Sequence, residues 1–201
     1  MDTLAAFDVD NTLTTRDCVL PFMRRVAGDS GLVLSAARHG LALSKAAAGR
    51  DRDRAKASMC RSIFAHRSQS QINGIGTSYA EHVFTRWMRP DTLGRLQWHQ
   101  RQGHQVALVS ASLGAYLHPL GTLLGVNHVV CTELEAHGDV LTGELDGGNC
   151  RGTAKVERLL KRFGSRPSAV WAYGDSAGDR ELLAWADHAT LVGRAHVGPS
   201  P

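Results

Sequence analysis

The chain has 201 residues, of which 43% are hydrophobic and 21% are charged, and its formal net charge is +4. These values are ordinary for a soluble globular protein and exclude a largely disordered chain. No apolar run approaches the ~20 residues that a membrane-spanning helix needs, so no stable membrane insertion is expected. The four cysteines show no C-x-x-C spacing and the N-terminus does not resemble a signal peptide, so we expect a reducing, cytoplasmic location.

Two acidic residues follow the first apolar run of the chain. Residues 4–7 are apolar and strand-like, and Asp8 and Asp10 come directly after them. Because side chains alternate along an extended segment, the two carboxylates lie on one side and share a site. Carboxylates that close repel each other, and both stay ionised only beside a cation or an ammonium group. The pattern therefore predicts that later residues supply such a partner.

Two later apolar runs, residues 105–109 and 169–173, also end in polar residues. Ser110 follows the first of these runs, and Asp175 and Asp179 follow the second, with a helical pattern shortly after each. In open parallel sheets the ligand site lies beyond the carboxyl ends of the strands. We therefore expect these side chains to meet the first acid pair at one edge of a sheet.

The segment between the first two predicted strands carries helical patterns and little strand signal. Arg89 and Pro90 mark its end, since proline suits a first helical turn and disfavours helix before it. We therefore predict a core formed by residues 1–14 and 89–201 and a helical insertion over 15–88. The helices predicted in the insertion cover residues 17–26, 31–48, 52–65 and 69–87.

The region before the last predicted strand contains a short hairpin and a helix. The hairpin strands are predicted at residues 132–135 and 140–142, and a helix follows over 153–163. Lys155 lies in the first part of that helix. It is the candidate ammonium group for the acid pair.

Four motifs together resemble the haloacid dehalogenase (HAD) superfamily of phosphohydrolases, in the branch that contains phosphoserine phosphatases. They are the D-x-D-x-T of Asp8–Thr12, Ser110, Lys155 and the G-D-x-x-x-D of Gly174–Asp179, in the expected order over residues 8–179. The resemblance implies an α/β fold with a Rossmann-like, three-layer parallel-sheet core. It also implies that the helical insertion is a cap domain that closes over the site.

The resemblance implies Mg²⁺-dependent hydrolysis of a small-molecule phosphomonoester through an aspartyl-phosphate. Asp8 is then the nucleophile, and Asp10 is the acid that later acts as the base. The implied Mg²⁺ ligands are the Asp8 carboxylate, the backbone carbonyl of Asp10 and the Asp175 carboxylate, with Asp179 supporting the ion through water. The implied phosphate-binding groups are the Ser110 hydroxyl, the backbone N–H of Ala111 and the Lys155 ammonium.

The sequence leaves the substrate open. Phosphoserine phosphatases carry a cap glutamate shortly after the first motif, and this chain has the shorter Asp17 there, which we assign to substrate specificity. The family's cap also carries an arginine for the substrate carboxylate, and the sequence singles out none. Phosphoserine, another phosphorylated metabolite and a phospholipid head group therefore all stay candidates.

Residues 50–67 hold six basic and two acidic side chains, which accounts for the whole net charge of +4. We interpret this segment as a solvated helix face. The alternative is steering of anionic substrates, or contact with phospholipid or nucleic acid. Aromatic residues are not interleaved among the basic ones apart from Phe64, so we expect no nucleic-acid partner.

Three other classes of protein fit the residues less well than a phosphatase. A phosphoaccepting signalling receiver shares the residue types, but it accepts phosphate in mid-chain and lacks a large helical insertion. A HAD-fold dehalogenase needs neither Asp10 as an acid nor a metal. A calcium loop at Asp8 requires glycine at its sixth position, which is Leu13 here.

Ser112 is predicted to cap the helix that follows, and Asn11 is expected to tolerate a left-handed backbone.

Overall fold

The computed structural model describes residues 3–29, 31, 52–193 and 197. The predicted helix over 31–48 therefore lies almost entirely outside the described residues. The described strands form one sheet in the order β4-β3-β2-β1-β5-β6, in which every neighbouring pair is parallel except β3 and β4. The strands are β1 (Thr3–Phe7), β2 (Gln105–Leu113), β3 (His128–His137), β4 (Val140–Asp146), β5 (Ala169–Gly174) and β6 (His188–Leu191).

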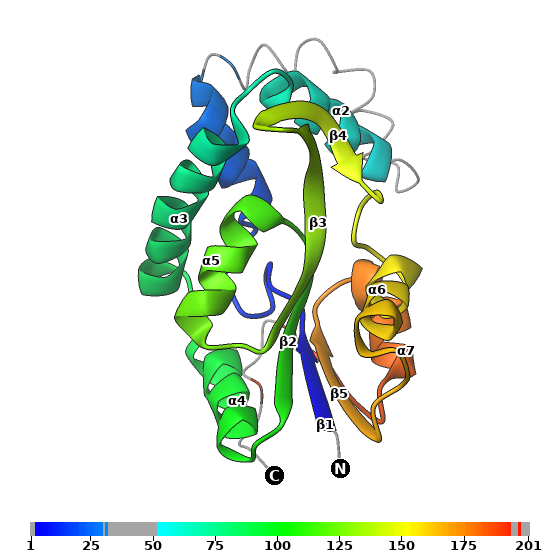
Figure 1. Cartoon of the computed structure of the whole chain (residues 1–201). Helices are drawn as coiled ribbons and strands as arrows, with labels where there is room; N and C mark the ends of the chain where they lie inside the picture. The colour runs from blue at the N-terminus through cyan, green and yellow to red at the C-terminus, as the bar shows by residue number, and fades with distance from the viewer. Residues whose placement is uncertain (1–2, 30, 32–51, 194–196, 198–201) are drawn as a thin grey trace.

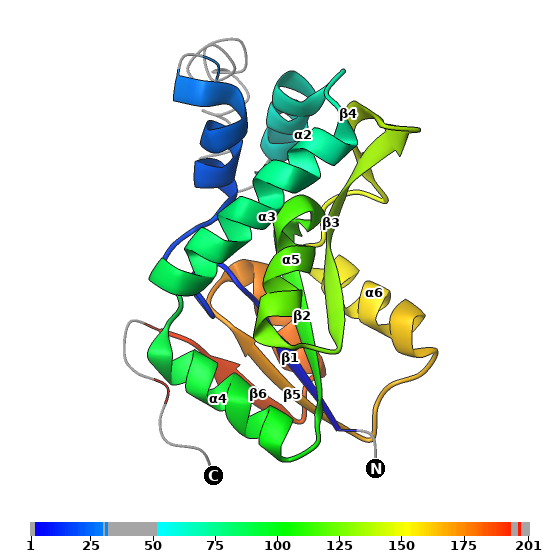
Figure 2. The same ribbon diagram turned by 60° about the vertical axis from the view of Figure 1, so that its left-hand side comes forward.

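Helices cover both faces of this sheet, as Figures 1 and 2 show. After a helix over residues 19–29, the named helices are α2 (Arg52–Phe64), α3 (Gln69–Arg86), α4 (Pro90–Arg101), α5 (Gly114–Leu124), α6 (Thr153–Phe163) and α7 (Arg180–Trp185), the last preceded by the 3₁₀ turn η1 (Ala177–Asp179). In Figure 1, α4 and α5 lie on one side of the strands and α6 and α7 on the other.

The alternation of side chains along β1 produces these layers. Leu4 and Ala6 pack in one buried cluster with residues of α6 and α7, whereas Ala5 and Phe7 pack in a second cluster with residues of α4 and α5. A strand buried on both faces explains why residues 4–7 are continuously apolar. The predicted three-layer α/β core is confirmed.

Several strand boundaries differ from the prediction. β2 continues to Leu113, past the expected end at Val109, because pairing with β3 resumes at Leu113 and Thr132 after a shift in register. The hairpin strands are longer than expected, since β3 joins the main sheet before it turns into β4. β6 was not predicted, because its four residues are mostly exposed and show no apolar alternation.

The two connections to the insertion run side by side. Thr14 forms an antiparallel bridge with Met88. The backbone N–H of Thr15 donates to the Trp87 carbonyl at 2.8 Å, and the N–H of Arg89 donates to the Leu13 carbonyl, also at 2.8 Å. The chain therefore leaves the sheet layer and returns to it at a single point.

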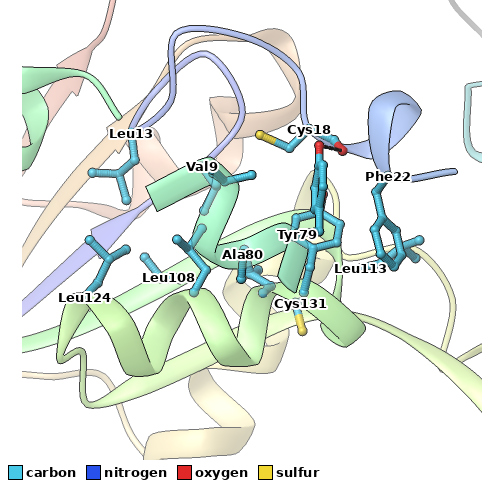
Figure 3. Packing of buried hydrophobic residues seen from close by; sticks show 14 of the residues in the cluster. Val9, Leu13, Cys18, Phe22, Tyr79, Ala80, Leu108, Leu113, Leu124 and Cys131 are labelled. Carbon is cyan, nitrogen blue, oxygen red and sulfur yellow. Dashed lines mark hydrogen bonds between the residues drawn. The ribbon is translucent and has the colours of Figure 1, made fainter. Parts of the chain in front are cut away.

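The insertion shares one apolar cluster with the sheet and α5. Its aromatic centre joins Phe22, Tyr79 of α3 and Tyr116 of α5, with ring centroids 4.9 to 5.3 Å apart. Figure 3 shows Phe22 and Tyr79 in this cluster, with the Tyr79 hydroxyl donating to the Cys18 carbonyl at 2.8 Å. The described part of the insertion is thus packed directly on α5.

Among the described residues, no helix combines the length and apolarity needed to cross a bilayer.

Candidate active site

Asp8 lies immediately after β1, at the carboxyl edge of the sheet. Its backbone N–H donates to the Tyr173 carbonyl at the end of β5, at 2.9 Å, which fixes the residue between two strand ends. Its side chain is buried and accepts a hydrogen bond from Thr12 Oγ1 at 3.2 Å. Burial raises the pKa of Asp8, while the ammonium of Lys155 opposes that rise.

Lys155 extends from the first turn of α6 into the same site. Its Nζ lies 2.7 Å from Asp8 Oδ1 and 2.5 Å from Asp179 Oδ1, and its side chain is only 2% exposed. Burial disfavours the charged form, but the carboxylates of Asp8 and Asp179 outweigh it and hold the pKa of Lys155 above its ordinary value. The charged ammonium form of Lys155 is therefore favoured beside Asp8.

The loop after β5 is organised by Asp179. Its Oδ2 accepts the backbone N–H groups of Asp175 and Ser176 at 3.2 and 3.1 Å and the Ser176 hydroxyl at 3.0 Å. Carboxylate oxygens of Asp8, Asp175 and Asp179 lie within 4.8 Å of one another. Burial, with the neighbouring Asp8 and Asp179, raises the pKa of Asp175 to about 6. Three carboxylates thus share one ammonium, and the excess negative charge suits a divalent cation.

The carboxylate of Asp10 is held away from that cluster by two donors. The backbone N–H of Cys18 donates to Oδ1 at 2.9 Å, and the Ser112 hydroxyl donates to Oδ2 at 2.7 Å. Burial, followed by the charges of Asp17 and Asp8, raises the pKa of Asp10 to about 7. A carboxyl group with that pKa can exchange a proton near neutral pH, as a general acid and base must.

Ser112 does not cap the following helix, and that prediction was wrong. The residue at the N-cap of α5 is Leu113, and no side chain caps it. Because β2 extends through Ser112, the Ser112 side chain lies on the strand and reaches Asp10 instead of the helix. Ser110, two residues earlier, is buried, and its Oγ accepts the Ser112 N–H at 3.1 Å. The period of two along β2 was the signal that could have placed both serines together.

Asp17 lies at the beginning of the helix over residues 19–29. Its Oδ1 accepts the backbone N–H of Leu20 at 3.1 Å, the type of bond made by a helix-capping side chain. This bond explains why the helix begins at residue 19 and not at 17 as predicted. Nearby, Asn11 has the expected left-handed backbone, with φ of 59°.

A small cavity of about 210 Å³ joins these groups. Its lining includes Asp8, Asp10, Asp17, Ser110, Ala111, Arg151, Lys155, Asp175 and Asp179, so every site residue expected from the sequence borders it. A larger hollow of about 580 Å³ adjoins it and shares Asn11 and Asp175 in its lining. Arg151, in the loop before α6, was missed because an isolated arginine carries no motif.

Lys56 of α2 was also missed as a contact to this edge of the sheet. Its Nζ donates to the Ala111 carbonyl, to Asn149 Oδ1 at 2.8 Å and to Thr132 Oγ1 at 3.3 Å. Burial of this ammonium lowers its pKa. Lys56 therefore does not belong to a solvated helix face, whereas Arg61 of the same helix does and pairs with the half-exposed Glu144 at 2.5 Å.

The open α/β sheet with carboxylates, a lysine and a serine at its carboxyl edge is a Rossmann-like fold with one ligand site beyond its strand ends. The sequence matches the haloacid dehalogenase-like hydrolase family over residues 5–184, and the chain belongs to this family. It is 33% identical over 185 residues to Protein CicA of Caulobacter vibrioides, a match that spans 92% of this chain and 83% of the relative.

Solved structures agree in fold. A protein of unknown function from Bordetella pertussis superposes with a TM-score of 0.78 at 22% identity and covers 92% of this chain and 86% of its own. A substrate-bound phosphoserine phosphatase superposes with a TM-score of 0.58 at 16% identity and covers 92% of this chain and 83% of its own. Both likenesses show the fold.

Proposed function

We propose that this chain is a Mg²⁺-dependent phosphomonoesterase whose nucleophile is Asp8. The observation that carries the proposal is the ion pair between Asp8 and Lys155 in a cavity that Ser110 and Asp175 also line. Phosphate monoesters are anionic, so a catalyst must neutralise charge and align a nucleophile. The ammonium beside the carboxylate supports both tasks. The phosphoserine phosphatase neighbour and the family assignment point to the same reaction class.

Asp8 attacks phosphorus and forms an aspartyl-phosphate, and the ester oxygen leaves with the proton that Asp10 donates. The resulting Asp10 carboxylate then takes a proton from water, which attacks the phosphorus and restores the Asp8 carboxylate. The Ser112 hydroxyl and the Cys18 N–H orient Asp10 for both steps. The phosphoryl oxygens are bound by the Ser110 hydroxyl, the Ala111 N–H, the Lys155 ammonium and the Arg151 guanidinium.

Mg²⁺ fits the oxygen-rich side of the cavity. The ligands we propose are the carboxylates of Asp8 and Asp175 and the backbone carbonyl of Asp10, with Asp179 in support. The raised pKa values of Asp8 and Asp175 reflect burial and mutual repulsion that a divalent cation relieves. When bound, the ion neutralises part of the phosphoryl charge.

We propose that residues 15–88 act as a cap on a core formed by residues 1–14 and 89–201. The paired connections at Thr14 and Met88 support this division. The substrate we propose is small, of the phosphoserine or phospholipid head-group type, and its phosphate lies in the cavity of about 210 Å³. We assign Asp17 to its recognition, because Asp17 lines the cavity from the first segment of the cap.

Steady-state hydrolysis of p-nitrophenyl phosphate with Mg²⁺ tests the reaction class. We expect turnover in the wild type, loss of turnover in Asp8→Asn, and normal turnover in Asp146→Asn, an exposed acid away from the cavity. A metabolite phosphate panel then ranks substrates. A stable phosphoprotein without turnover would identify a receiver, and turnover that survives Asp8→Asn would refute the proposed nucleophile.

A further inference from the structure

A second group of metal-ligating side chains lies between α5 and β3. It consists of His118 on α5 and Cys131 and Glu133 on β3, whose ligand atoms all lie within 4.8 Å of one another. His118 Nε2 is 2.8 Å from Glu133 Oε1, Cys131 Sγ is 2.9 Å from the same oxygen, and the sulfur and nitrogen are 3.8 Å apart. Because Cys131 and Glu133 are two residues apart on a strand, both face α5.

We propose that His118, Cys131 and Glu133 form a binding site for Zn²⁺, separate from the carboxylate cluster around Asp8. Zinc binds imidazole nitrogen, thiolate sulfur and carboxylate oxygen, and this cluster offers one of each. Usual zinc bond lengths in a tetrahedron place sulfur and nitrogen about 3.6 Å apart, close to the separation found here. The Glu133 oxygen needs to retreat by less than about 1 Å to reach the same spacing. Three protein ligands leave the fourth position for water.

The hydrogen bonds in the cluster occupy the places that a metal ion takes. The Cys131 thiol and the His118 Nε2–H both donate to Glu133 Oε1, so two protons converge on one oxygen. On metal binding the thiol loses its proton to solvent, and the imidazole keeps a proton only on Nδ1. The bound ion then carries two positive charges against one thiolate and one carboxylate. The site is therefore neutral when loaded, and binding releases at least one proton.

The surrounding structure leaves the cluster both fixed and accessible. Cys131 is buried, and its carbonyl accepts a hydrogen bond from Arg158 Nη1 at 2.5 Å, which anchors β3. The side chains of His118 and Glu133 are 53% and 43% exposed and border a hollow of about 340 Å³ between α3 and α5. A Cβ at Gly114 would lie 2.1 Å from Glu133 Oε2, so the glycine leaves room for this carboxylate in its observed position.

Zinc titration of the full chain in excess Mg²⁺ tests the site, because Mg²⁺ competes poorly for thiolate and imidazole ligands. We expect one Zn²⁺ per chain with a Kd of roughly micromolar or tighter. Co²⁺ in place of zinc should give the near-ultraviolet absorption of a thiolate–cobalt bond, which reports Cys131 directly. Calorimetry in buffers of different ionisation enthalpy should show the released proton.

Variants on half-exposed side chains keep the test independent of folding. His118→Ala and Glu133→Gln should each weaken zinc binding about 100-fold or more and remove the thiolate–cobalt absorption. His137→Ala, on an exposed histidine at the end of β3, and Asp175→Asn, in the catalytic cluster, should leave both signals unchanged. Zinc binding that survives His118→Ala, cobalt binding without the thiolate absorption, or the absence of saturable binding would each overturn the proposal.

Discussion

Gly76 sets how closely α3 of the insertion packs on α5. A Cβ at Gly76 would lie 2.0 Å from the Ala115 carbonyl oxygen and 2.5 Å from its carbonyl carbon, and both atoms belong to the backbone. Backbone atoms cannot relieve the clash by a change of rotamer, so Gly76→Ala must push α3 and α5 apart. Gly74, on the same helix, is exposed, and a Cβ there would meet nothing within 4 Å. Gly74→Ala is therefore a matched control for the change in helix propensity.

The two variants should change the free energy of unfolding in opposite directions. Alanine gains about 1 kcal/mol over glycine inside a helix, so Gly74→Ala should raise the free energy of unfolding by up to that amount. Overpacking against backbone should cost about 3 kcal/mol at Gly76, which leaves Gly76→Ala destabilised by about 2 kcal/mol. For a chain of this length the difference of about 3 kcal/mol separates the two Tm values by roughly 6–12 °C. Urea and thermal denaturation measure both quantities. Equal stabilities of the two variants would refute the close helix contact.

Three further predictions concern the site and its surroundings. Lys56→Met should lower kcat/KM roughly tenfold or more, because Ala111 loses its contact with Lys56 and is misplaced. The free energy of unfolding should change by only about 1 kcal/mol. A variant with the kcat/KM of the wild type would show that Lys56 does not position Ala111. Asp17→Asn keeps the helix cap but removes the charge, so it should alter preference among metabolite phosphates more than turnover of p-nitrophenyl phosphate; equal losses on both would contradict a specificity role. Burial lowers the pKa of His99 to about 3 in the folded protein. Below pH 6.5 the His99 imidazole therefore binds a proton in the unfolded protein but not in the folded one, so the free energy of unfolding falls as the pH falls. Between pH 6.5 and 5.5 the wild type should lose about 1 kcal/mol more than His99→Gln, and parallel unfolding curves would contradict this linkage.

The sequence was sufficient to predict the layers of the core. Strands buried on both faces are continuously apolar, so β1, the first part of β2 and β5 could be recognised from composition alone. Ser110 and Ser112 interrupt that pattern, which is why the apolar run predicts a strand only as far as residue 109. β6 is an edge strand with exposed side chains and offers no such signal.

The contacts of the site were harder to predict than its members. Motif spacing singled out Asp8, Lys155 and Asp175, because parallel strands bring their carboxyl ends to one edge. It gave no hint of Lys56, whose partners lie on β2, β3 and the loop before α6 and meet it only through the packing of α2. Long-range contacts of this kind depend on tertiary structure, which no local pattern encodes.

Trapping the covalent intermediate tests the central claim most directly. Asp10→Asn removes the base that activates water, and p-nitrophenyl phosphate has a leaving group that needs no acid, so the phosphorylated enzyme should accumulate after it is mixed with this substrate and Mg²⁺. Acid quenching and peptide mass spectrometry should then find the mass of one phosphoryl group on the peptide that contains Asp8, and hydroxylamine should remove it. Phosphate on Ser110, or product release by this variant with unmodified Asp8 throughout, would contradict nucleophilic attack by Asp8.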